Sequence, residues 1–102
     1  MLKVEDLIQR VEEWAFDRGI IQNSTAKAQL LKAVAELGEL CDAEIKDDRY
    51  GQTDGVGDVL VCLIIYCHMR ELSLPTCLNS AYEEIKNRQG RMVSGGAFIK
   101  ES

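Results

Sequence analysis

The chain has 102 residues, enough for one domain, and its 46% hydrophobic residues can supply a modest core. Its 12 basic and 17 acidic residues give a net charge of −5. This balance argues against a nucleic-acid partner, because nucleic-acid-binding proteins usually present a basic surface. A phosphorylated small ligand remains compatible with it, provided that a cation bridges the two negative partners.

The cysteines and the apolar runs indicate the compartment. None of the four cysteines forms a CxxC pair, and the first residues do not follow a signal-peptide pattern. We therefore expect reduced thiols in a cytoplasmic protein. The longest apolar run, residues 59–67, is too short to cross a bilayer, so no membrane partner is expected.

Apolar residues that recur every three or four positions predict the first two helices. The first is expected from about residue 4 to residue 18, where Gly19 supplies a stop. The second is expected from about residue 24 to residue 46, with Ser24 as its N-cap. The stripe of this second helix that is expected to face the core consists of Leu30, Val34, Leu37, Cys41 and Ile45.

A polar loop over residues 47–53 precedes the third predicted helix, which begins near residue 53 or 54 and ends near residue 72. Its middle, residues 59–67, is apolar on every side; a β-strand is the alternative there, but the helical flanks favour a helix. The fourth helix is expected from Pro75 to about Gly90. Its expected buried face consists of Leu78, Ala81, Tyr82 and Ile85.

Four helices joined by short loops predict an all-α four-helix bundle in one domain, residues 1–102, with residues 91–102 as a C-terminal tail. Phe98 and Ile99 suggest that this tail docks on another surface. A helix that is apolar all round must be covered all round. Because one small chain can barely cover residues 59–67, we expect a homo-oligomer, either a dimer or a tetramer.

Four carboxylates form two pairs, each on one helical face. Glu36 and Glu39 are three residues apart on the second helix, and Asp54 and Asp58 are four apart on the third. Like charges this close destabilise a bare helix, whereas a hard cation such as Mg²⁺ between them reverses the effect. If the two helices are antiparallel neighbours, the four carboxylates can converge on one or two Mg²⁺ ions that carry a polyphosphate.

Each pair also has a plainer interpretation. Glu36 and Glu39 lie nearly opposite the expected core stripe, so they could simply face solvent. The alanines beside them weaken that alternative, because small residues let another backbone come close. Asp54 could be a first-turn residue that interacts with the helix dipole. Asp58 immediately precedes the apolar run and therefore stands at the mouth of a buried region.

Segment 36–39, Glu-Leu-Gly-Glu, followed by segment 57–60, Gly-Asp-Val-Leu, resembles the MazG-like branch of the all-α nucleoside triphosphate pyrophosphatases. These proteins carry ExxE on one helix and ExxD on the next. Residues 81–101, with their Gly-Gly-x-Phe tail, are similar to the short single-domain MazG-like proteins of phages and mobile elements. One position departs from the pattern: Gly55 replaces the third acidic residue, and Asp54 is a candidate substitute.

The resemblance implies an Mg²⁺-dependent enzyme, with Mn²⁺ as a substitute ion, that hydrolyses a nucleoside triphosphate to the monophosphate and pyrophosphate. A house-cleaning role against non-standard or surplus deoxynucleotides is also implied. Glu36, Glu39 and Asp58 would hold the metal with Asp54 as a fourth ligand, and Glu36 or Glu39 would be the catalytic base. The residues expected to bind the substrate are Lys32, Asn79, Tyr82, Lys86, Arg88 and Arg91, with Lys100 as a further basic candidate.

Several alternatives remain open from the residues alone. Each basic candidate could be a solvated surface charge, Asn79 a local cap, and the aromatic rings of Trp14 and Tyr82 part of the core rather than stacked on a base. The whole chain could be a non-catalytic interaction module, or a pyrophosphohydrolase of another phosphoanhydride. A ferritin-like oxidase is disfavoured, because no glutamate lies three residues before His68.

Overall fold

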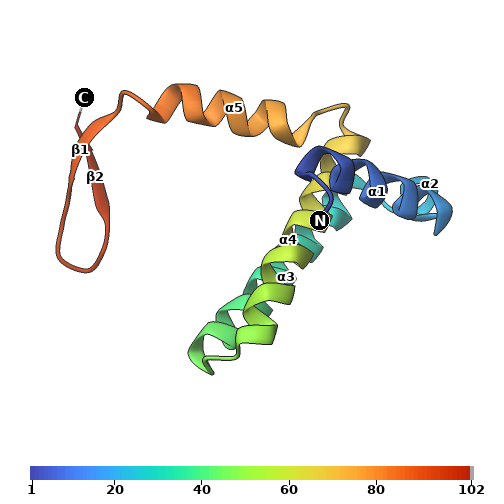
Figure 1. The fold of residues 1–102 in the computed structure, drawn as a ribbon, viewed down its shortest axis with the longest axis horizontal. Coiled ribbons are helices and arrows are strands. Elements are labelled where there is room, and N and C mark those ends of the chain that lie inside the picture. The colour runs from blue at the N-terminus through green and yellow to red at the C-terminus, as the bar shows by residue number, and fades with distance from the viewer. Residues whose placement is uncertain (102) are drawn as a thin grey trace.

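The computed structural model describes residues 1–101, which form five helices and a two-stranded antiparallel sheet (Figure 1). The chain is thus predominantly helical, as predicted. Its elements in chain order are α1 (Val4–Asp17), α2 (Ile20–Asn23), α3 (Ala26–Ile45), α4 (Arg49–Met69), α5 (Leu74–Ile85), β1 (Gln89–Met92) and β2 (Phe98–Glu101).

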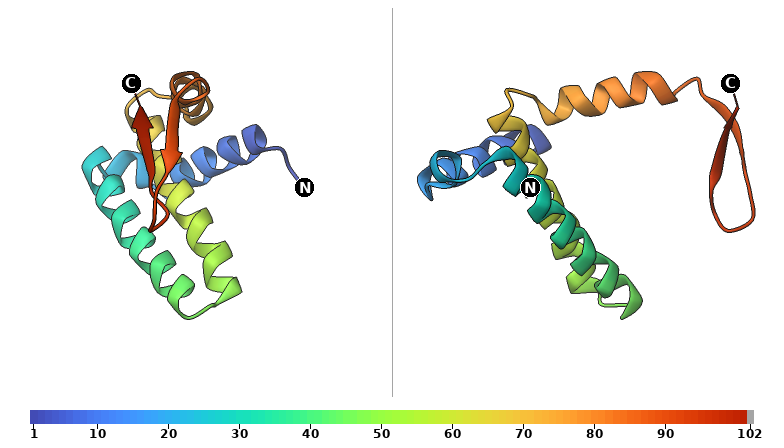
Figure 2. Two further views of the ribbon diagram at one scale, coloured as in Figure 1. Left: turned by 90° about the vertical axis from the view of Figure 1, so that its left-hand side faces the viewer. Right: turned by 180° about the vertical axis from the view of Figure 1, so that it is seen from behind.

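The centre of the molecule is an antiparallel hairpin of α3 and α4, which lie side by side along most of their length (Figures 1 and 2). Gly55 allows this close packing: a Cβ atom built on it would lie 3.0 Å from the Leu40 Cβ. The apolar run in α4 is helical, so the β-strand alternative is wrong. Its buried residues are Cys62, Ile64, Ile65 and Cys67.

Capping side chains set the helix starts, and two of them differ from the prediction. The Thr25 hydroxyl, not that of Ser24, caps α3 by accepting a hydrogen bond from the Ala28 N–H at 3.1 Å. The Asp48 carboxylate caps α4 by accepting from the Gly51 N–H at 3.1 Å. Helix α4 therefore begins at residue 49 rather than 53, and most of the predicted polar loop is helical.

The predicted core face of α3 is wrong within one chain. Val34 is 68% exposed and Ile45 is 82% exposed, while Ala33 and Ala43 are buried. Small residues let α3 approach α4 closely, so the helix packs through its small side chains and leaves its large apolar stripe facing outward. Gln29 is also buried on the packed face, where its amide donates to the Ser24 hydroxyl at 3.0 Å.

Helix α1 crosses α4 near the C-terminal end of the hairpin. Ala15 is fully buried at 0% exposure, and the Glu12 carboxylate contacts the His68 ring nitrogen Nδ1 at 2.9 Å. Gly19, with a φ of 76°, ends α1 as expected and turns the chain into the short α2. His68 is thus engaged in holding α1 to α4.

Helix α5 and the β-hairpin lead away from the α3–α4 hairpin, so the four predicted helices do not close into a bundle within one chain (Figures 1 and 2). The predicted buried face of α5 is exposed: Leu78 is 69% exposed, and Tyr82 and Ile85 are more than half exposed. The helix also ends at Ile85, not near Gly90.

The strands at the end of the chain were not predicted. Strands β1 and β2 pair in the register Met92↔Phe98 to Gln89↔Glu101, joined by a turn at Gly95 and Gly96. Both glycines have positive φ values, 94° and 88°, which residues with side chains rarely adopt. Phe98 and Ile99 remain largely exposed, so the segment predicted as a docking tail does not dock on its own chain.

Within residues 1–101, no single helix is long and apolar enough to cross a membrane. Helices α4 and α5 meet that criterion of length and composition only as a pair, and they are bent by 102° relative to each other. All four cysteines are free thiols in the structure. Cys62 and Cys67 are buried, but Cys41 and Cys77 are exposed, so the interpretation of the cysteines as core residues is correct for only two of them.

Candidate metal and nucleotide site

The four predicted carboxylates all lie on the α3–α4 hairpin. Glu36 and Glu39 come from α3, one helical turn apart, and Asp54 and Asp58 come from α4, also one turn apart. Glu36 and Asp58 are half-buried, whereas Glu39 and Asp54 are exposed. Because α4 begins earlier than predicted, Asp54 lies in its second turn and is not a first-turn dipole residue.

The electrostatics show that the two pairs sense each other across the helices. The pKa of Glu36 is raised above its ordinary value, first by a side-chain hydrogen bond with Glu39, then by desolvation and by the charges of Glu39 and Asp58. The pKa of Asp58 is raised mainly by desolvation, and further by Asp54 and Glu39. We call these four residues the acidic cluster.

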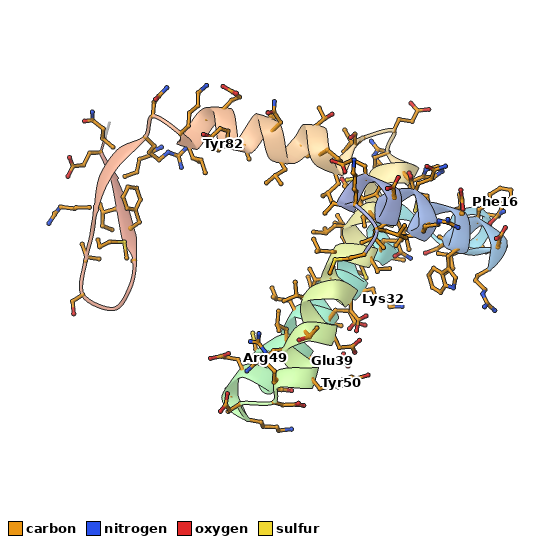
Figure 3. The ribbon with its side chains drawn as sticks, viewed as in Figure 1. Phe16, Lys32, Glu39, Arg49, Tyr50 and Tyr82 are labelled. Carbon is orange, nitrogen blue, oxygen red and sulfur yellow. The ribbon has the colours of Figure 1, made fainter. Side chains whose placement is uncertain are left out.

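Lys32 is the basic residue that faces the acidic cluster. Its charge acts in the opposite direction to the carboxylates and lowers the pKa values of both Glu36 and Asp58. In Figure 3, Lys32 and Glu39 project from the same side of the α3–α4 hairpin. Lys32 forms no direct ion pair with either acid among the residues that the structure describes, so its ammonium group can reach a ligand.

The donor chemistry of the cluster fits a hard divalent cation, because carboxylate oxygens are the ligands that Mg²⁺ and Mn²⁺ prefer. The hydrogen bond with Glu39 and desolvation are the largest causes of the raised pKa values of Glu36 and Asp58 respectively, and repulsion between the carboxylates adds to both. The carboxylates are, however, arranged as two separate pairs. Over residues 1–101, no three acidic, histidine or cysteine side chains are close enough together to form a ready-made metal site.

The other predicted substrate-binding residues lie away from the acidic cluster within one chain. Asn79 and Tyr82 are exposed on α5, and Figure 3 shows Tyr82 far from Glu39. Lys86 forms an ion pair with Glu83 one turn earlier, and the Arg91 Nε lies 3.7 Å from the Glu101 Oε1. Arg88 is exposed between α5 and β1. The single chain therefore brings Lys32, but not these five residues, to the acidic cluster.

The exposed position of Trp14 beside the acidic cluster differs from the sequence prediction. Trp14 is not a core residue: its side chain is 46% exposed and lines a groove between α1 and α4 that also contains Asp58. Helical spacing predicted burial for the ring, but the α1–α4 crossing leaves it open. The arrangement of Trp14 next to an acid of the cluster becomes visible only once α1 is placed against α4.

The fold is similar to that of the cyanophage S-2L MazG-like pyrophosphohydrolase, which was solved bound to dGDP and three catalytic Mn²⁺ ions per active site. The TM-score is 0.74 and the sequence identity 18%, and the similarity covers 99% of this chain and 95% of that one. The MazG-like fold that segments 36–39 and 57–60 suggested is thereby confirmed.

A sequence relative comes from another phage. An uncharacterised 18.2 kDa protein from the rep-hol intergenic region of Haemophilus phage HP1 (strain HP1c1) is 35% identical over 65 residues. The match covers 64% of this chain but only 40% of the phage protein, so this chain spans well under half of that relative. No protein-family model matches the sequence.

Proposed function

We propose that this chain is a divalent-metal-dependent nucleoside triphosphate pyrophosphohydrolase. The observation that carries the proposal is the acidic cluster: four carboxylates from two packed helices, faced by one lysine, in a fold shared with a MazG-like pyrophosphohydrolase. In the reaction, the oxygen of water bonds to the α-phosphorus, the bond between that phosphorus and the α–β bridging oxygen breaks, and pyrophosphate leaves the nucleoside monophosphate.

Glu36, Glu39 and Asp58 are the residues that would hold the metal, with Asp54 as the fourth ligand beside Gly55. When bound, Mg²⁺ (or Mn²⁺ in its place) would polarise phosphate oxygens and make bound water more acidic. The chain itself supplies the proton acceptor. Glu36 or Glu39 would be this acceptor, through a carboxylate oxygen that the metal leaves free.

Lys32 is proposed to contact the phosphates. Its ammonium group lies close enough to Glu36 and Asp58 to change their pKa values, yet within residues 1–101 it forms no ion pair with either. A cation in this position offsets the charge that develops on phosphate oxygens during the reaction.

A homo-oligomer is proposed because Asn79, Tyr82 and the basic residues after them can reach an acidic cluster only if it belongs to another copy. The outward apolar stripe of α3 and the exposed face of α5 leave a large unpaired hydrophobic surface, including Val34, Leu37 and Leu78. If the α3 stripe of one copy packs against the α5 face of another, the apolar surface is buried and the α5 residues are brought to an acidic cluster. A dimer and a tetramer both allow this arrangement.

The biological setting follows from the same proposal. A house-cleaning role against non-standard or surplus deoxynucleotides would suit a small pyrophosphohydrolase of this kind, and the four free cysteines support a cytoplasmic location.

The proposal is tested by incubating the purified protein with each of the eight common nucleoside and deoxynucleoside triphosphates, with and without Mg²⁺. We expect pyrophosphate release from at least one of them, only when the metal is present. A helical protein, verified by circular dichroism, that releases none from any of the eight would overturn the proposal in favour of a non-catalytic interaction module.

A further inference from the structure

A groove between α1 and α4 begins where the acidic cluster ends. Its volume is about 330 Å³, and Asp58 belongs to both the groove and the cluster. The residues that line it are Leu7, Arg10, Val11, Trp14, Asp58 and Val61.

The groove is made by two facing helical stripes. On α1, Leu7, Val11 and Trp14 follow one another at intervals of four and three residues, and on α4 Val61 comes one turn after Asp58. The walls are therefore apolar, with Asp58 and Arg10 as the charged residues among them. Arg10 forms no ion pair within residues 1–101, so its guanidinium group is free to donate hydrogen bonds.

Trp14 decides what chemistry suits this groove. Trp14 is 46% exposed, although the next residue in the chain, Ala15, is fully buried. A half-exposed indole in an apolar groove suits a flat aromatic ligand, because bases stack on aromatic side chains with little dependence on their identity. A volume of about 330 Å³ lies at the small end of ligand pockets, which span about 300–1,000 Å³. It suits one base better than a whole nucleotide.

We propose that this groove binds the nucleobase of the nucleotide, with Trp14 stacked on its ring face and Arg10 donating to acceptor atoms on its edge. The sugar then leads past Asp58 toward the acidic cluster. The polyphosphate is assigned to the metal at the acidic cluster and not to the groove, whose walls are mostly apolar. The inference rests on the proposed function for the orientation of the nucleotide, but the binding of the base can be measured without any turnover.

Trp14 is the only tryptophan in the sequence, so fluorescence excited at a wavelength that the three tyrosines do not absorb reports on this groove. The protein is titrated, in Mg²⁺, with the four deoxynucleoside monophosphates, and separately with deoxyribose 5-phosphate and with pyrophosphate. We expect saturable quenching by at least one monophosphate and none by the two base-free compounds. Equal responses to compounds with and without a base, or no response to any monophosphate up to millimolar concentration, would overturn the proposal.

Variants give a second, independent readout. Phe16→Leu is the matched control, because Phe16 is an exposed aromatic of the same helix that does not line the groove. We expect Trp14→Leu to raise the KM for a nucleoside triphosphate about tenfold with kcat changed little, as loss of one stacking contact requires. Phe16→Leu should keep the KM of the wild type. Equal KM values for the two variants would contradict the assignment of Trp14.

If the wild type hydrolyses no nucleotide, the proposed function fails, whereas the fluorescence titration still tests the groove. If hydrolysis occurs but Trp14 does not respond to bases, only the groove assignment fails. The two failures are therefore distinguishable.

Discussion

Replacing Gly55 by alanine tests the packing that brings the two carboxylate pairs together. A Cβ atom on residue 55 would lie 3.0 Å from the Cβ and the Cδ1 of Leu40 and 3.2 Å from its Cα. Alanine in a helix gains about 1 kcal/mol over glycine, but overpacking a close contact costs about 1–3 kcal/mol. Because the Leu40 backbone is part of the contact, we expect the cost to exceed the gain.

Gly57→Ala is the matched control, since no atom lies within 4 Å of a Cβ at residue 57 and the helix-propensity gain is unopposed. The two variants are compared by thermal unfolding, followed by circular dichroism. One kcal/mol corresponds to a Tm shift of about 4–8 °C in a domain of this size. We expect Gly57→Ala to raise Tm by roughly that amount and Gly55→Ala to lower it. Equal stabilisation by both would refute the close α3–α4 approach at Gly55.

The same contact bears on the missing third acid of the MazG-like pattern. Restoring it with Gly55→Glu places a larger side chain against Leu40, so we expect a lower Tm than for Gly55→Ala and no gain in hydrolysis. Increased hydrolysis by Gly55→Glu would instead show that Asp54 does not replace the missing acid.

The remaining predictions concern a cap, the apo acidic cluster and the exposed face of α5. Asp48→Ala removes the α4 cap and should cost about 1 kcal/mol, measured by urea unfolding; an unchanged midpoint would contradict the capping role. Glu36 and Asp58 have raised pKa values in the folded state, so their ionisation opposes folding, and the metal-free protein should gain stability as pH falls from neutral through these pKa values. Addition of Mg²⁺ at neutral pH should raise Tm, and Glu36→Gln should raise the Tm of the metal-free protein while reducing the Mg²⁺ shift; a full Mg²⁺ shift in this variant would exclude Glu36 as a ligand. Leu78→Asp combined with Ile85→Asp should lower the mass measured by light scattering to that of a single chain, and an unchanged mass would remove α5 from the subunit interface.

The sequence predicted the four long helices because periodicity and punctuation agree in each of them. Gly19 marks a turn, and Pro75 lies at the start of α5. The polar residues 49–53 predict a loop, although α4 already begins at Arg49. The Asp48 cap, which depends on local geometry, was the stronger signal.

The packing faces could not be predicted in the same way. Periodicity identifies the apolar side of a helix, but not whether its partner belongs to the same chain. Helix α3 therefore shows its large residues, such as Leu37, to the outside and packs on α4 through Ala33 and Ala43. The β-hairpin was missed because its strands contain only four residues each, too few for a clear alternating pattern.

The acidic cluster was predicted in its membership but only partly in its geometry. Spacing alone places Glu36 beside Glu39 and Asp54 beside Asp58. The effect of each pair on the pKa values of the other depends on the antiparallel packing of α3 and α4. The sequence alone does not establish that packing. The Trp14 groove lay beyond sequence reasoning, because it depends on the angle at which α1 crosses α4.

The most direct test of the pyrophosphohydrolase proposal is ³¹P NMR of a deoxynucleoside triphosphate incubated with Mg²⁺ and either the wild type or the Glu36→Gln, Glu39→Gln double variant. The acidic cluster predicts equal amounts of nucleoside monophosphate and pyrophosphate with the wild type and unchanged triphosphate with the double variant. Release of orthophosphate in place of pyrophosphate, or equal turnover by the double variant, would contradict it.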